Sequence, residues 1–121
     1  MARIPYLIAG LATLVAIAAP TSTGMASATK LKGTTGPGFT IGLKKGNAKV
    51  KTLTPGKYSI TVNDKSKIHN FRLKGPGLNK QITSISFKGT KTVTVTLKKG
   101  KYTYQCDPHA SQGMKGTFRV S

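Results

Sequence analysis

The stretch that decides the fold of this chain is residues 100–114, GKYTYQCDPHASQGM. In its first half Tyr102, Tyr104 and Cys106 alternate with lysine, threonine and glutamine, which is the period-2 pattern of a strand with one buried face. Its second half contains a proline and a glycine, and both residues favour turns. We therefore predict that a strand ends at Cys106 on its inward face and that a loop follows.

The same alternation recurs along much of the chain, and no window shows a sustained helical stripe. The other inward-facing sets are Phe39, Ile41 and Leu43; Tyr58, Ile60 and Val62; His69, Phe71 and Leu73; Val93, Val95 and Leu97; and Phe118 and Val120. Turn residues separate these runs. About seven to eight short strands of this kind predict an all-β fold, an antiparallel Greek-key β-sandwich with one buried face per sheet.

The N-terminus has the order of a secretory signal peptide. Arg3 precedes an apolar run over residues 4–19, and the sequence MASA at residues 25–28 supplies small residues at a cleavage site. An uncleaved membrane anchor is the alternative, but the apolar run is shorter than the roughly 20 residues needed to cross a bilayer. We predict a signal peptide, residues 1–28, that is cleaved on export to the periplasm or the extracellular space.

The remaining chain is long enough for one compact domain and too short for two. Residues 29–38 are polar and rich in glycine, so we expect them to form a flexible lead-in. The folded domain is then predicted to span residues 39–121. With no second core to build, any functional site must lie on this one domain.

Cys106 is the only cysteine of the chain. A single cysteine cannot form an intrachain disulfide, and an unpaired thiol in an exported protein calls for an explanation. A buried and inert thiol is the simplest alternative. The neighbouring histidine and methionine favour metal binding instead.

Cys106, His109 and Met114 form the pattern C-x2-H-x4-M, and His69 shares an inward face with other core residues. The loop after Cys106 can bring these side chains to one point, and His69 can reach the same end of the sandwich. Two imidazoles, a thiolate and a weak thioether are the ligands of a type 1 blue copper site. Alternatively, His69 is a histidine at the edge of the core and Met114 fills a gap in it.

In residues 106–116 and in His69-Asn70-Phe71 the chain resembles the cupredoxins of the plastocyanin and pseudoazurin kind. The resemblance implies one copper ion bound by the four residues named above. It also implies that Asn70 steadies the cysteine sulfur and its loop, and that His109 reaches the surface inside an apolar patch. Candidates for that patch are Pro108, Ala110 and residues 75–77.

Two departures from plant plastocyanins limit this resemblance. Gln105 replaces the aromatic residue that precedes the cysteine in those proteins, and acidic patches are absent. The interval between His69 and Cys106 is nearer that of bacterial proteins, which favours a bacterial or archaeal source. Asp107 is expected to be a turn residue ahead of a proline, with no chemical role.

The charge of the chain is strongly positive, with 20 Lys and Arg against 2 Asp and Glu and a formal net charge of +18. Such imbalance predicts attraction to an acidic redox partner or to an anionic envelope surface. An equally weighted alternative is that the lysines only maintain solubility and protect sheet edges. Nucleic acid is disfavoured as a partner, because arginine is scarce and no reading motif is present.

These features predict a monomeric one-electron carrier that cycles between Cu(II) and Cu(I). It is not expected to be an enzyme, because its two acidic residues form no obvious pair and four ligands leave copper no open position. Two alternatives stay open. One is an extracytoplasmic copper carrier or buffer, and the other is a basic envelope-binding module built on a cupredoxin scaffold.

Overall fold

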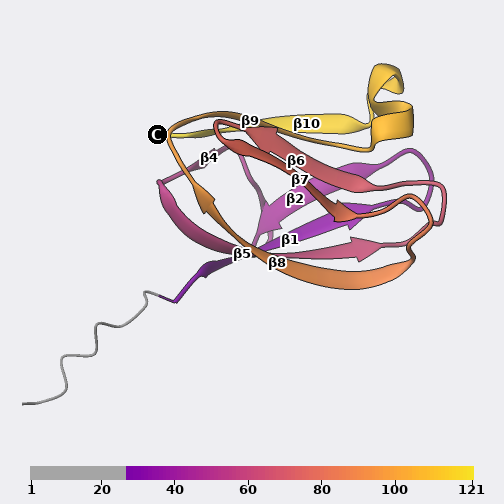
Figure 1. Cartoon of the computed structure of the whole chain (residues 1–121), viewed down its shortest axis with the longest axis horizontal. Helices are drawn as coiled ribbons and strands as arrows, with labels where there is room; N and C mark the ends of the chain where they lie inside the picture. The colour runs from indigo at the N-terminus through magenta and orange to yellow at the C-terminus, as the bar shows by residue number, and fades with distance from the viewer. Residues whose placement is uncertain (1–26) are drawn as a thin grey trace, which may run out of the picture.

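The structure, a computed structural model, describes residues 27–121. The predicted signal peptide lies outside these residues except for its last two. Within them the chain forms ten strands and one short 3-10 helix, η1 (Figure 1). The elements are β1 (Thr29–Thr35), β2 (Ile41–Lys45), β3 (Ala48–Lys49), β4 (Thr52–Leu53), β5 (Gly56–Asp64), β6 (Phe71–Gly75), β7 (Leu78–Thr83), β8 (Gly89–Leu97), β9 (Gly100–Gln105), η1 (Asp107–Gln112) and β10 (Lys115–Val120). No helix among the described residues is long and apolar enough to cross a membrane.

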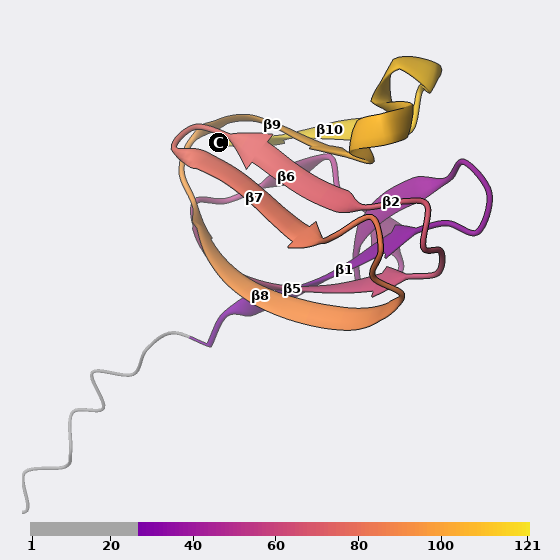
Figure 2. The same cartoon turned by 45° about the vertical axis from the view of Figure 1, so that its right-hand side comes forward.

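The strands form two five-stranded sheets that pack face to face as a β-sandwich (Figures 1 and 2). One sheet has the order β3-β2-β1-β5-β8 and the other has the order β4-β10-β9-β6-β7. Aromatic and aliphatic side chains from both inner faces fill the space between them, among them Leu43, Ile60, Phe71, Leu73 and Tyr102, all 0% exposed. The predicted all-β sandwich is confirmed.

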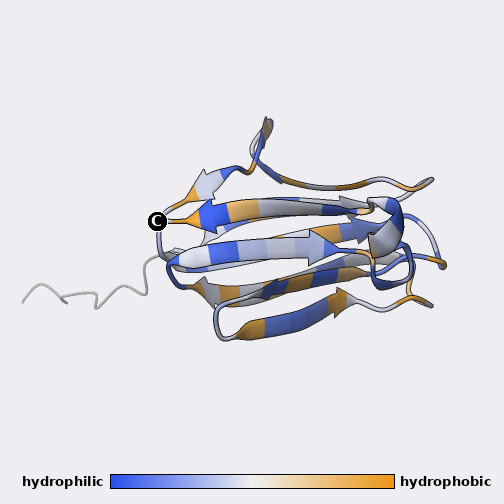
Figure 3. Ribbon diagram, turned by 90° about the horizontal axis from the view of Figure 1, so that it is seen from above, coloured by the Kyte–Doolittle hydropathy of each residue, from blue (hydrophilic) through white to orange (hydrophobic). Residues whose placement is uncertain are grey.

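Most of the predicted alternation is confirmed. Tyr58, Ile60 and Val62 on β5 are buried, as are Tyr102 and Tyr104 on β9. Figure 3 shows the resulting bands of hydrophilic and hydrophobic residues along the strands. Because successive side chains of a strand point to opposite faces, this pattern places one side of each sheet in the core.

The sheets are mixed rather than purely antiparallel, and the strands are more numerous than predicted. β1 pairs with β5 in parallel, with Leu31 opposite Ile60, and β4 pairs with β10 in parallel. β3 and β4 contain two residues each, too few to show a periodicity. β7 has an exposed run before its buried residues Ile82 and Thr83, so its alternation is also hidden.

The expected flexible lead-in is wrong for most of its length, because Thr29–Thr35 forms strand β1 in the middle of a sheet. Its inward positions are Leu31, Gly33 and Thr35, of which only the first is a large apolar residue. Gly33 lies under the ring of Phe71, where an added Cβ would meet a ring carbon at 3.0 Å. The strand thus packs through small residues that a hydrophobic pattern does not detect.

Phe39 was expected to begin a strand and face the core, and this is also wrong. β2 begins at Ile41, and the Phe39 side chain is 62% exposed in the loop before it. That loop lies at the same end of the sandwich as the β5–β6 loop and η1 (Figure 1). The exposed ring is therefore near the candidate site.

Candidate metal centre

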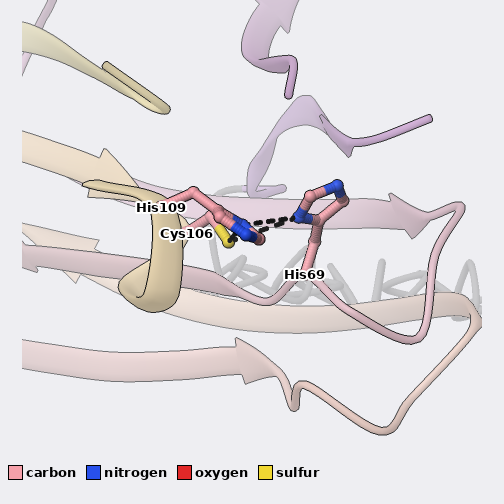
Figure 4. A group of neighbouring side chains, drawn as sticks. All are labelled: His69, Cys106 and His109. Atoms are coloured by element: carbon pink, nitrogen blue, oxygen red, sulfur yellow. Dashed lines mark hydrogen bonds between the residues drawn. The ribbon is translucent and has the colours of Figure 1, made fainter. Parts of the chain in front are cut away.

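The predicted ligands come from three different segments at one end of the sandwich. Cys106 directly follows β9, His69 lies two residues before β6, and His109 is part of η1. Met114 lies between η1 and β10. Figure 4 shows the side chains of the two histidines and the cysteine pointing toward one another.

Three donor atoms converge at this point. Nδ1 of His69 lies 3.0 Å from Nδ1 of His109, and Sγ of Cys106 lies 3.6 Å and 3.4 Å from these two nitrogens. A point equidistant from the three atoms is about 1.9 Å from each, close to metal–nitrogen and metal–thiolate bonds of roughly 2.0–2.3 Å. Two imidazoles and a thiolate in a trigonal arrangement suit copper, so the residues fit the ion that the sequence predicts.

The loop after Cys106 has the geometry needed for this convergence. Pro108 lies in the first turn of η1, and Gly113 ends the helix with φ of 91°, a left-handed conformation that favours glycine. Backbone hydrogen bonds close the loop on itself, from the Met114 amide to the His109 carbonyl and from the Cys106 amide to the Met114 carbonyl. Met114 is therefore held at the base of the same loop, with its side chain 1% exposed.

The site is buried on one side and reaches the surface on the other. Cys106 is 0% exposed and His69 is 1% exposed, whereas His109 is only partly buried. The ring of Phe39 packs edge-on against His109, with 4.7 Å between centroids, and against His69 at 5.8 Å. Phe39 thus covers both imidazoles, a role that its apolar character alone did not reveal.

A hydrogen-bond network holds the residue that follows Cys106. The Asp107 amide donates to Oδ1 of Asn70 at 2.6 Å, and Nδ2 of Asn70 donates to the Asp107 carboxylate at 2.9 Å. Arg72 and Gln105 also donate to this carboxylate. Asn70 therefore holds the loop through Asp107, and it makes no hydrogen bond to the cysteine sulfur among the described residues.

Asp107 was expected to have only a turn role, and the structure shows that it is the centre of this network. Its partial burial disfavours the charge, but hydrogen bonds from Gln105, Arg72 and Asn70 and the charge of Arg72 outweigh this, so the pKa of Asp107 is lowered. The sequence signal was the scarcity of acids. With two carboxyl groups against twenty basic residues, each acid is a candidate for a specific contact.

The second acid, Asp64, is buried behind the site and is 1% exposed. Burial raises the pKa of Asp64, although a hydrogen bond from the Ser66 amide and the nearby His69 partly offset the effect. The Nε2 atom of His69 and the Oδ2 atom of Asp64 are buried and have no hydrogen-bond partner among residues 27–121. Both acids of the chain therefore lie around the candidate metal centre.

The apolar surface at this end differs from the one expected. Residues 75–77 form the β6–β7 turn at the opposite end of the sandwich, because β6 runs away from the site (Figure 1). The large hydrophobic residues exposed among the described residues are instead Phe39, Ile68 and Ile85, all in loops at the site end. Pro108 is exposed beside them.

Comparisons with known proteins agree with this geometry. The sequence profile of copper-binding proteins of the plastocyanin/azurin family matches residues 44–121. The solved structure of rusticyanin from Thiobacillus ferrooxidans is similar, with a TM-score of 0.54 and 24% identity over 76% of each chain.

A second similar structure is reduced auracyanin from the photosynthetic bacterium Roseiflexus castenholzii. Its TM-score is 0.54, with 19% identity over 78% of this chain and 98% of that one. At these identities both structures show the shared fold. No curated protein sequence matches the chain.

Proposed function

The chain belongs to the plastocyanin/azurin family of copper-binding proteins, and on that basis we propose that it is an exported one-electron carrier with copper ligands His69, Cys106, His109 and Met114. The chain is a cupredoxin, and copper is its cofactor. The observation that carries the proposal is the convergence of the cysteine sulfur and two imidazole nitrogens in one buried cluster. Copper bound there supplies a centre that gains and loses a single electron.

The protein's own residues divide the remaining tasks. Cys106 and His69 supply donors from inside the sandwich, where burial excludes water. Backbone hydrogen bonds and the network around Asp107 keep the loop that carries His109 in place. A site whose donors are fixed by the fold needs little rearrangement when the charge of the ion changes, which favours rapid electron transfer.

Electrons are proposed to enter and leave at the His109 end. His109 is the least buried of the three converging residues, and Phe39 and other exposed apolar side chains lie around that end. A redox partner protein can dock there through an apolar contact. The positive charge of the chain suits a partner with an acidic surface. We expect no substrate turnover, because four protein ligands would fill the positions around copper.

Export, cleavage after Ala28, action as a monomer and a periplasmic or extracellular location are part of this proposal. The signal-like N-terminus supports export. Copper binding would account for the unpaired cysteine in an exported protein. The mature domain proposed here begins at Thr29 instead of Phe39, because β1 pairs with both β2 and β5.

A copper carrier or buffer with the same four ligands is the rival function. The two functions differ in copper release, since an electron carrier must keep its ion through many redox cycles. The test is to reduce and reoxidise the copper-loaded protein repeatedly in the presence of a Cu(I) chelator and to measure retained copper. Retention in both oxidation states supports electron transfer, whereas rapid transfer of Cu(I) to the chelator contradicts it.

A further inference from the structure

A band of cationic side chains wraps one edge of the sandwich, where β2 and β3 of one sheet meet β4 and β10 of the other. All of its members are exposed, and none of them makes an ion pair among the described residues. This cationic band consists of Lys32, Lys44, Lys49, Lys51, Lys101 and Arg119.

The first half of the band is a row of lysines across three strands. Lys32 lies directly opposite Lys44 in the β1–β2 pair, and Lys44 lies directly opposite Lys49 in the β2–β3 pair. Opposed residues point to the same face of a sheet, about 5 Å apart, and like charges placed in this way destabilise the pairing. Lys32 and Lys44 also line one surface hollow together with two threonines.

The second half continues the row around the edge. Lys49, Lys51, Lys101 and Arg119 line one hollow together. Arg119 lies opposite Lys101 in the β9–β10 pair, and its amide donates to the carbonyl of Lys51 at 3.0 Å. Four positive charges thus surround one depression in the surface.

Neither acidic side chain of the protein neutralises this charge. The chain has two acidic side chains, and both are at the metal end. Asp64 is buried, and Asp107 is bound by Arg72. An uncompensated and self-repelling row is expected to persist only if a partner of opposite charge stabilises it, because a solubilising charge need not be clustered.

The half of the band that contains Lys101 and Arg119 is separate from the metal centre. Lys101 lies near the start of β9, and Cys106 follows the end of that strand, so the two are about 17 Å apart along it. Figure 1 shows the C-terminus, two residues beyond Arg119, at the opposite end of the sandwich from η1. A ligand on this part of the band leaves the His109 end free.

We propose that the cationic band binds a linear polymer of phosphates that carries no bases, of which inorganic polyphosphate is the simplest example. The band is made mostly of lysines beside threonines, without an exposed aromatic ring. Protein interfaces are depleted of lysine and rely on aromatic anchors. In residues 27–121 the large hydrophobic side chains that are exposed lie at the metal end instead. Lysines that are opposed on neighbouring strands, with Cα atoms about 5 Å apart, instead suit a flexible chain of phosphates, because each ammonium is a mobile point charge. The protein would be held at one edge while its copper end exchanges electrons.

The test compares two variants of equal charge by titration calorimetry. In the band variant Lys44, Lys49, Lys51 and Arg119 are changed to Gln. In the control variant Lys57, Lys80, Lys91 and Lys98, which lie toward the other edge, are changed to Gln. The copper-loaded proteins are titrated with linear inorganic polyphosphate at several salt concentrations, and their visible absorption and melting temperature show that each variant is folded.

The band variant is predicted to bind polyphosphate at least about tenfold more weakly than the unchanged protein. The slope of log K against log salt concentration should also be smaller by about three for this variant. The affinity of the control variant should stay within about twofold of that of the unchanged protein. Equal loss in both variants would overturn the proposal, because net charge alone would then explain binding.

Two ligand controls accompany the titration. Orthophosphate at the same phosphate concentration should bind far more weakly than the polymer, and equal binding would contradict a linear ligand. Polyglutamate bound as tightly through the same four residues would also overturn the proposal, in favour of an acidic protein partner.

Discussion

The Nε atom of Arg72 donates to both carboxylate oxygens of Asp107, at 2.8 and 3.1 Å. This contact joins strand β6 to the residue that follows Cys106, and the side chain of Asn70 makes a second connection between the same two segments. His69 lies one residue before Asn70. The network therefore sets the distance between the two segments that supply the cysteine and the first histidine.

We expect Asp107→Asn to keep the copper–thiolate absorption but to release copper faster. The substitution removes the charge that Arg72 and Gln105 bind, and loss of such hydrogen bonds costs about 1–2 kcal/mol. Copper release to a chelator and urea unfolding of the copper-free protein measure the two effects. Thr117→Ala, on the exposed face of β10, is the control. Unchanged release and stability would show that the network has no positioning role.

The two acids should have opposite effects on stability as pH changes. The raised pKa of Asp64 means that its ionisation costs folding free energy as pH rises above about 3.9, the usual value for an unfolded chain. The lowered pKa of Asp107 means that its contribution is present at neutral pH and is lost as pH falls below about 4. Asp64→Asn should therefore stabilise the copper-free protein at pH 7 and have little effect near pH 3.

Urea unfolding of the copper-free protein between about pH 3 and pH 7 tests this prediction. Asp107→Asn serves as the comparison, since its destabilising effect should be largest at neutral pH and should disappear in acid. If Asp64→Asn destabilises the protein at pH 7, the carboxylate makes a favourable contact that outweighs its burial.

Met114→Gln should keep the intense visible absorption and lower the reduction potential. A harder amide oxygen in the axial position favours Cu(II) more than a thioether does. Met114→Leu, which offers no donor, should shift the potential in the opposite direction. Voltammetry of the three proteins measures the shifts, and equal potentials would mean that Met114 only fills the core.

Phe39→Ala should lower the potential and leave the absorption in place. The ring covers both imidazoles, and removing it admits water, which stabilises the more highly charged oxidation state. Ile85→Ala, which truncates an exposed side chain in another loop at the same end, is the control. A potential that both substitutions change equally would argue against a specific role for Phe39.

The sequence predicted the parts of this molecule that depend on local pattern. The alternation of Tyr102, Tyr104 and Cys106 gave the strand that leads into the site, and the proline and glycine after it gave the loop. β1 was missed because its inward positions include Gly33 and Thr35, which carry no hydrophobic signal. Its burial depends on Phe71, a residue far away in the sequence.

The candidate site likewise has residues that the sequence predicts and residues whose roles only the structure shows. The spacing of Cys106, His109 and Met114 is a local signal, and only the single other histidine was needed to complete the set. The roles of Asp107 and Phe39 depend on contacts across the sandwich, with Arg72 in one case and the two imidazoles in the other. Such contacts depend on strand order and register, which local patterns do not determine.

A copper–thiolate bond at Cys106 is tested by the visible absorption spectrum of the purified protein after addition of Cu(II), beside its Cys106→Ser variant. Ser111→Ala, in the same loop, is the control. A copper–thiolate site predicts an intense band near roughly 600 nm in the natural protein and in the control, and its loss in Cys106→Ser. A colourless protein, or a band that survives replacement of Cys106, would contradict a copper–thiolate site at the end of this sandwich.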